Sequence, residues 1–290
     1  MKKTIFSVLV ILLLVGTNAI ASNDWLQTNT TSTDWFDPLN WDDGVVPSLT
    51  VLTGTRTNQT HMASVMPIIT SGQNAESHQL KIGGDNDVWV DDISKSKGSI
   101  TLNGGTITTN DYYRVGASSS SNRWGEFFMN SGTVTVGGYM AVPRGNTSTN
   151  THGYAYISGG NIDVASHLYI CHGGASSGLL DISGGTITVG GNLIMRNGGT
   201  ILLPAAPYLN DAPTTELNIT GTGRIILAGN QVAAVQGYRD NGWILNGVEE
   251  LDDSLIVYDP GSNTTTLGIP EPATICLFGL GAMGLIRRRK

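Results

Sequence analysis

Cationic side chains that recur near the end of a repeated unit are the first residues here whose types and spacing could do chemistry. They are Arg114, Arg144, His172 and Arg196. Such a row could contact the acidic groups of a polysaccharide, and a basic side chain could abstract a proton in a lyase. Polysaccharide cleavage also needs two or three carboxylates, or carboxylates that bind Ca²⁺ beside the base. Asp111 is the one acidic residue near a matching position, so the pattern favours glycan contact or solvated corner charges over catalysis.

Two further arrangements could carry catalysis or a metal, and the sequence argues against both. Cys171 and His172 would be a nucleophile and its base, but neighbouring residues of a strand point to opposite faces. The histidines lack metal-ligand spacing, and the aspartate pairs lack the glycine-rich pattern of a Ca²⁺ repeat. These residues are His61, His78, His152 and His167, and Asp42–Asp43, Asp91–Asp92 and Asp252–Asp253. We therefore predict a protein that is not an enzyme and that holds no metal or cofactor.

Three tryptophans lie close together before the repeats, at Trp25, Trp35 and Trp41. An exposed indole stacks on the apolar face of a sugar, so Trp35 and Trp41 are candidate glycan contacts. Their place at the open end of a repeat domain also fits an aromatic plug that covers the first coil. The plug is the simpler interpretation.

The elements that must position these residues are four copies of one pattern between Ile100 and Gly199. The clearest copy begins at Leu180 and reads LDISGGTITVGGNLIM, and the others begin at Ile100, Phe127 and Ala155. Aligned on the residue after the Gly-Gly or Ser-Gly pair, they repeat about every 27 residues. This period indicates a repeat architecture, in which each unit buries its apolar face against its neighbours.

Within each copy the apolar residues alternate with polar ones, break at a glycine step and alternate again. Alternation at every second residue is typical of strands, and the glycine steps are typical of corners. We therefore predict an all-β protein, a right-handed parallel β-helix (β-solenoid) with three short strands in each coil. Every inward position of the four copies is apolar except Thr109. The core should hold Ile107, Val134, Ile162 and Ile187 in a single file.

Threonine pairs occupy outward positions of the middle strand. They are Thr106/Thr108, Thr133/Thr135 and Thr186/Thr188, with Asn161/Asp163 in the third copy. Threonines about 7 Å apart along a strand and about 4.8 Å apart between coils form a flat array. Such an array resembles the surface of ice-binding solenoids. Threonine is also a common outward residue of strands, so ice binding is a minor alternative.

The segments around the repeats are typical of export and of capping. Residues 1–21 have the charged start, apolar run and small-residue cleavage site of a signal peptide. Residues 22–99 are interpreted as an N-terminal cap with irregular first coils, and residues 100–227 as the solenoid core. We interpret residues 228–268 as a C-terminal β cap, because the open end of a solenoid must be covered.

The composition fits a secreted β protein, with 38 Gly and 13% charged residues. The net charge of −7 at pH 7 disfavours nucleic acid as a partner. The two cysteines are Cys171 and Cys276, and the second lies in the apolar C-terminal run. No disulfide framework is therefore expected to hold the fold.

The segment 269–290 carries the most specific motif of the sequence. Pro270, Glu271 and Pro272 precede an apolar run at 273–286, and Arg287, Arg288 and Arg289 follow it. As a helix the run would cover about 21 Å, short of a hydrocarbon core of about 30 Å. It therefore suits a brief stay in the membrane better than permanent anchoring. The basic residues should stay cytoplasmic, which leaves the solenoid outside.

These three parts, in this order, resemble the PEP-CTERM sorting signal. The resemblance covers this segment alone. It implies export through the inner membrane, anchoring by a short C-terminal transmembrane helix before sorting, and then a place at the cell surface or in the extracellular matrix. It also implies an exosortase-type sorting enzyme as a partner and a host that makes exopolysaccharide.

We therefore expect an exported, non-catalytic protein of the cell surface or extracellular matrix, with a structural or adhesive role and an association with exopolysaccharide. Its candidate glycan contacts are Trp35, Trp41, Arg114, Arg144 and Arg196. The alternative is a polysaccharide-binding or polysaccharide-degrading β-helix enzyme. An ice-binding solenoid is the minor alternative.

Overall fold

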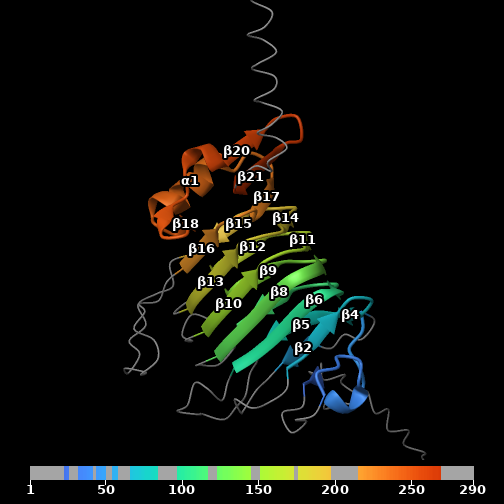
Figure 1. Cartoon of the computed structure of the whole chain (residues 1–290). Coiled ribbons are helices and arrows are strands. Elements are labelled where there is room, and N and C mark those ends of the chain that lie inside the picture. Colours follow the sequence, from blue (N-terminus) through green and yellow to red (C-terminus); the bar gives the residue numbers. More distant parts are fainter. Residues whose placement is uncertain are drawn as a thin grey trace, which may run out of the picture.

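Figure 1 shows a computed structural model of the chain. The structure describes residues 23–25, 32–41, 44–49, 54–57, 66–83, 97–116, 123–144, 151–172, 176–196 and 215–268. The predicted signal peptide at 1–21 and the predicted apolar helix at 273–286 lie outside these residues. Among the residues described, no helix is both long and apolar enough to cross a membrane.

The chain winds into a parallel β-solenoid (Figure 1). Each regular coil adds one strand to each of three ladders of paired strands. The first ladder contains β3 (Ile68–Thr70), β10 (Thr151–Ile157), β13 (Ser176–Ile182), β16 (Thr215–Ile219) and β18 (Ile244–Asn246). The second contains β4 (Asn74–Ser77), β11 (Asn161–Val164), β14 (Thr186–Val189) and β17 (Arg224–Ala228). The third contains β1 (Asn23–Asp24), β2 (Gly54–Thr57), β5 (Gln79–Ile82), β7 (Tyr113–Val115), β9 (Met140–Arg144), β12 (Leu168–His172) and β15 (Leu193–Met195). The long strands β6 (Lys97–Thr109) and β8 (Arg123–Val136) take part in both the first and the second ladder. We call the outer surfaces of the ladders the first, second and third faces.

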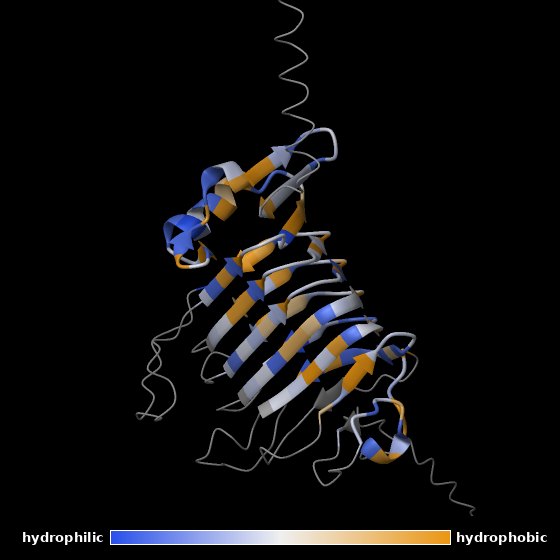
Figure 2. Ribbon diagram, in the orientation of Figure 1, coloured by the Kyte–Doolittle hydropathy of each residue, from blue (hydrophilic) through white to orange (hydrophobic). Residues whose placement is uncertain are grey.

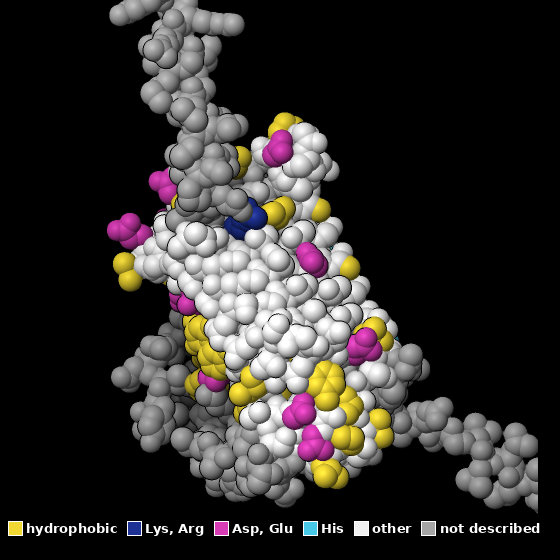
Figure 3. Space-filling view, turned by 45° about the vertical axis from the view of Figure 1, so that its right-hand side comes forward, with side chains coloured by type: hydrophobic (Ala, Val, Ile, Leu, Met, Phe, Trp, Pro, Cys, Tyr) yellow, Lys and Arg dark blue, Asp and Glu magenta, His cyan; other side chains and the backbone are white. Residues whose placement is uncertain are grey.

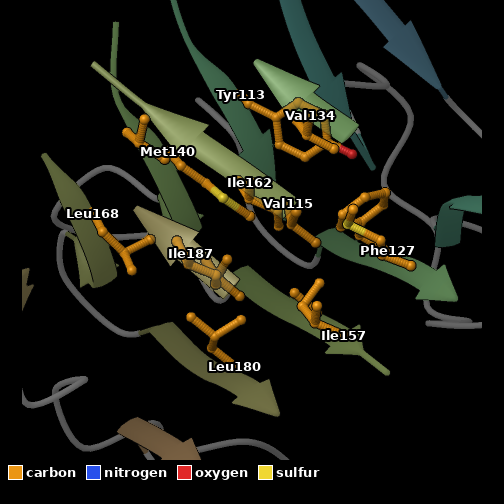
Figure 4. Close-up of a cluster of buried hydrophobic side chains, with 14 of the residues drawn as sticks. Tyr113, Val115, Phe127, Val134, Met140, Ile157, Ile162, Leu168, Leu180 and Ile187 are labelled. Atoms are coloured by element: carbon orange, nitrogen blue, oxygen red, sulfur yellow. The ribbon is translucent and has the colours of Figure 1, made fainter. Parts of the chain in front are cut away.

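The register between coils confirms the predicted repeat. The alignment positions of the four sequence copies pair with one another across the second ladder, and so do Ile107, Val134, Ile162 and Ile187. These four side chains are at most 1% exposed and form the predicted single file. Figure 4 shows Val134, Ile162 and Ile187 one after another along it. The other inward positions of the four copies are buried as well, Thr109 included. Figure 2 shows hydrophobic and hydrophilic residues alternating along the strands. Since successive side chains of a strand point to opposite faces, this alternation turns the hydrophobic ones inward.

The tryptophans of the N-terminal cap form a plug around the short helix η1 (Pro38–Asn40). Trp25, Trp35 and Trp41 are at most 2% exposed. The Trp41 ring stands edge-on to the other two, with centroids 5.1 Å and 4.7 Å apart, and its indole N–H donates to the Trp35 carbonyl at 2.8 Å. The burial of both rings fits the aromatic plug better than the glycan contact predicted for Trp35 and Trp41.

The C-terminal cap differs from the predicted β cap because it contains a helix, α1 (Val232–Asp240). Val235 is the buried residue of α1, so the helix lacks the broad apolar stripe that would reveal it in the sequence. The remaining elements are β19 (Glu249–Glu250), the short helix η3 (Asp253–Leu255), β20 (Ile256–Asp259) and β21 (Thr264–Gly268). The last two strands form a hairpin, and β21 pairs antiparallel with β17. Leu267 of β21 pairs with Ile225, which extends the apolar file and closes the tube.

Glycines at the corner between the first and second ladders let successive coils approach. Gly132, Gly160 and Gly185 occupy this corner and have φ angles of +106°, +89° and +79°. A Cβ atom on any of them would lie 2.4–2.5 Å from a carbonyl oxygen of the preceding coil. The corner therefore needs glycine both for its backbone conformation and for space.

We expect Gly160→Ala to lower the free energy of unfolding by about 2–5 kcal/mol, from left-handed backbone strain together with overlap with the Gly132 carbonyl. Gly237→Ala is the matched control, because a Cβ atom at this helical glycine meets nothing within 4 Å. The control should be neutral or stabilising by up to about 1 kcal/mol. Urea unfolding followed by circular dichroism measures both variants. Equal destabilisation by the two changes would contradict the role given to the corner.

Candidate functional site

Charged side chains are distributed unevenly over the solenoid. A broad area of the tube visible in Figure 3 carries neither charged nor hydrophobic side chains. On the third face, one outward position per strand lines up across the coils. Lys81 and Arg114 occupy this position on β5 and β7. Ala141 and Tyr169 follow on β9 and β12, so basic residues gather at the N-terminal end of this file.

The structure splits the predicted row of cations into two. Arg114 pairs with Ala141, whereas Arg144 pairs with His172 farther along the strands. The reason is that β9 and β12 continue two residues beyond the point where β7 ends. The N–H of Arg196 donates to the carbonyl of Ile170, which places Arg196 beside the end of β12. The predicted residues thus share one face without forming a straight line.

Tyrosine side chains hold the two central arginines. The guanidinium carbon of Arg114 lies 3.6 Å from the ring centroid of Tyr112 and 5.2 Å from that of Tyr139. Its Nε donates to the Tyr139 hydroxyl at 2.6 Å. The guanidinium of Arg144 lies 4.7 Å from the same Tyr139 ring. Such ring contacts fix long cationic side chains before any ligand arrives.

We call this group the Tyr139 cluster. It consists of Tyr112, Arg114, Tyr139, Arg144, Tyr169 and His172. The His172 ring stands edge-on to Tyr169, with centroids 4.3 Å apart, and Tyr169 stands edge-on to Tyr139 at 5.5 Å. The cluster therefore joins three successive coils through its rings.

The cations of the Tyr139 cluster repel one another. Burial, and next the positive charge of Arg114, lower the pKa of Arg144. Burial, and next the charges of Arg144 and Arg196, lower the pKa of His172. Asp111 favours the charged form of Arg144 and accepts a hydrogen bond from Gln79 at 2.7 Å. This part of an acidic protein is thus locally positive, and an anion bound here would relieve the repulsion.

The sequence after the solenoid determines where this surface is displayed. Residues 268–290 match the PEP-CTERM protein-sorting motif. The chain therefore carries a PEP-CTERM sorting motif. Such motifs are recognised by exosortase and imply export with sorting at the membrane. The predicted sorting residues Pro270, Glu271, Pro272, Arg287, Arg288 and Arg289 fall within the match and outside the described residues. We found no match to this chain among curated proteins or among solved structures.

Cys171 lacks the surroundings of a nucleophile. The residue has a φ angle of +56°, and its side chain is fully buried. Burial raises the pKa of the thiol to about 12, and hydrogen bonds with Thr215 and the Gly178 backbone offset only part of this effect. The thiol therefore stays protonated at neutral pH and out of reach of a substrate.

The residues examined as metal ligands do not come together in the described part of the chain. It contains no group of three or more His, Cys, Asp or Glu side chains that could hold a metal ion. Of the predicted candidates, His61, Asp42–Asp43 and Asp91–Asp92 lie outside the described residues.

The threonine pairs of the second face stand in register, with Asn161/Asp163 between the second and last pairs as expected. The array is bordered on both sides by other residue types. Asn74 precedes it and accepts a hydrogen bond from Thr106 at 2.8 Å. Arg224 follows it and donates to Thr186 at 2.8 Å. The flat threonine surface is therefore short, and ice binding stays a prediction of the sequence alone.

The first face carries aromatic residues that were not among the predicted site residues. Phe128 and Tyr156 stack, with centroids 5.3 Å apart and planes at 10°, and Trp124 lies 5.1 Å from Tyr154. They occupy outward positions of β8 and β10. The sequence does carry a signal for them, because aromatic residues alternate with the inward apolar residues along these two strands. This pattern shows that two faces of the tube, not one, present aromatic rings.

His152, which lacks metal-ligand spacing in the sequence, is buried in the first ladder. Its side chain is 4% exposed, and its Nδ1 lies 2.5 Å from the Ser177 Oγ. Its ring lies against Trp124, with centroids 5.5 Å apart. Burial lowers the pKa of His152 from 6.5 to about 4, because the charged imidazolium would lose its hydration there.

We expect acid to destabilise the protein through His152. A histidine whose pKa is lower in the folded state adds stability above its unfolded pKa of about 6.5, and this stability is lost as the pH falls toward 4. The loss should reach about 3 kcal/mol. His152→Gln should remove this part of the pH dependence while leaving the contribution of the carboxylates. Denaturant unfolding at pH 7, 6, 5 and 4 measures it, and identical pH slopes for both proteins would rule the assignment out.

Proposed function

We propose that this protein is a non-catalytic component of the cell surface or extracellular matrix, with a structural or adhesive role, held in exopolysaccharide. Export follows from the sorting motif. The observation that supports the glycan partner is the set of aromatic side chains that line two outer faces of the solenoid. The exosortase-type enzyme is the partner for sorting, and the polysaccharide is the partner after it.

The aromatic rings recur from coil to coil, as a polymer requires. On the third face, the partly exposed rings of Tyr139 and Tyr169 contact each other across adjacent coils, and the buried ring of Tyr112 packs against Tyr139 at 5.7 Å. On the first face, Phe128 and Tyr156 stack across adjacent coils. Neighbouring coils lie about 4.8 Å apart, a distance comparable to the length of one pyranose unit. Aromatic rings accept the apolar face of a pyranose, so successive sugars of one chain can meet successive coils.

The small number of carboxylates described near the Tyr139 cluster favours a binding role over the enzymatic alternative. A glycosidase needs two carboxylates about 5–10 Å apart across the scissile bond. In the described part of the third face, Asp111 is the carboxylate beside the cluster, and Gln79 already binds it. The lyase alternative would have to use His172 as its base, because the arginines stay protonated at neutral pH. Such a base also needs carboxylates that bind Ca²⁺ beside it, and among the described residues no group of three or more His, Cys, Asp or Glu side chains could hold a metal ion.

We expect the full chain to remain with the exopolysaccharide of the cells that make it. Enzymatic digestion of that polysaccharide should release the protein into the medium, since the solenoid would lose its support. A variant with Pro270, Glu271 and Pro272 all changed to Ala should fail to reach the surface, because the sorting motif is disrupted. Immunoblots of cell, matrix and medium fractions measure both effects.

Two results would contradict the proposal. Retention of the protein on cells after complete digestion of the polysaccharide would exclude the glycan as its support. Release of new reducing ends or unsaturated sugars by the purified full chain would show that the protein is an enzyme.

A further inference from the structure

Several basic residues lie on one face of this acidic protein. The chain has 23 acidic and 16 basic residues, yet Lys81, Arg114, Arg144 and Arg196 share the third face. Arg144 and His172 each have a pKa lowered in part by neighbouring cations. Like charges held close together repel, and an anionic group bound beside Arg144 and His172 would lower that repulsion.

The arginines are also held in place rather than extended into solvent. Arg114 is stacked on Tyr112 and hydrogen-bonded to Tyr139, and Arg144 lies over the Tyr139 ring. A guanidinium offers paired N–H donors that match the two oxygens of a carboxylate. In Arg114, Nε and Nη2 donate to the Tyr139 hydroxyl, so a carboxylate would meet the edge formed by the two Nη atoms. Because these side chains are already ordered, binding costs less conformational entropy than it would for mobile arginines.

We propose that the Tyr139 cluster binds an acidic polysaccharide, with Arg114 and Arg144 each receiving an anionic group of the sugar chain and the partly exposed rings of Tyr139 and Tyr169 receiving the sugar faces. This inference rests on the proposed function and adds the charge class of the glycan. The anionic groups are carboxylates of uronate units, for which the guanidinium geometry is suited. Sulfate groups share this chemistry and are distinguished in the test below.

A polysaccharide suits the cluster better than a nucleic acid does. Duplex DNA carries one charge per about 1.7 Å and is bound by proteins that neutralise many phosphates at once. Here the basic residues are few, and the overall net charge is −7, which repels so dense a polyanion. A uronate chain carries one charge per sugar, and its spacing is closer to that of the coils.

The test measures binding of the full chain, kept in mild nonionic detergent, to four probes by biolayer interferometry. The probes are polygalacturonate, the same polymer with its carboxyl groups reduced to alcohols, dextran sulfate and duplex DNA. We expect polygalacturonate to bind at least tenfold more tightly than its reduced form. Affinity should fall as NaCl is raised from 50 to 500 mM, because the charges involved are partly exposed.

Variants assign the binding to the cluster. Arg114→Gln and Arg144→Gln should each weaken polygalacturonate binding about tenfold, the effect of losing one charge-assisted hydrogen bond. Arg224→Gln is the matched control, since it removes the same charge from the second face, where Arg224 donates to Thr186. Tyr139→Phe keeps the ring but removes the hydroxyl that Arg114 uses, and should weaken binding less than loss of the arginine does. Equal effects of Arg114→Gln and Arg224→Gln would overturn the assignment.

A measurement on the unaltered protein covers the case in which the variants do not fold. The pKa of His172, followed by NMR, should rise when polygalacturonate binds, because a carboxylate near Arg144 offsets the charges that lower it. An unchanged His172 pKa at saturation would place the ligand elsewhere and overturn the inference.

The probes separate this inference from the proposed function. If the reduced polymer binds as well as the acidic one, the charge class is wrong while a glycan partner stands. If no polysaccharide binds, both are wrong. Tighter binding of dextran sulfate than of polygalacturonate would replace carboxylate by sulfate as the recognised group and overturn the uronate assignment. Tighter binding of DNA would overturn the choice of polysaccharide.

Discussion

The structure depends on the register with which each coil lies on the next. Ile107, Val134 and Ile162 stack directly because the strands that carry them pair residue for residue. A slip by one residue would turn every inward side chain outward. Two features at the corner resist such a slip. Gly132 and Gly160 bring the coils closer than any Cβ atom allows, and the Asn130 side chain donates to Asn103 at 2.7 Å across the same corner.

The same register builds the outer surface. Because the inward residues are fixed, the residues between them are displayed in files on three faces, and each file repeats at the spacing of the coils. The Tyr139 cluster results from files on the third face that combine tyrosine with arginine. Contacts of Arg114 and Arg144 with the Tyr139 ring offset part of the repulsion between the two cations. The register of the buried residues thus determines which outward side chains lie together and can contact a ligand.

The two open ends of the solenoid are covered by different structures. A parallel solenoid has open ends with unpaired strands and exposed apolar residues. At the N-terminal end Trp25, Trp35 and Trp41 fill the opening, and at the C-terminal end the hairpin of β20 and β21 covers it. The sorting motif begins at Gly268, the last residue of β21, so the closed tube directly precedes the segment that directs export.

The sequence by itself determined the period, the inward residues, the glycine corners and the sorting motif, because alternation, backbone freedom and a short linear motif are local properties. It did not determine which outward residues meet. Arg114 faces Ala141, and Arg144 faces His172, because the strands of the third ladder differ in length. Whether the Trp35 ring is exposed or buried also depends on the residues that pack against it in the folded chain. Only the tertiary structure decided these points, since the surroundings of a long side chain exist only once the neighbouring coil is in place.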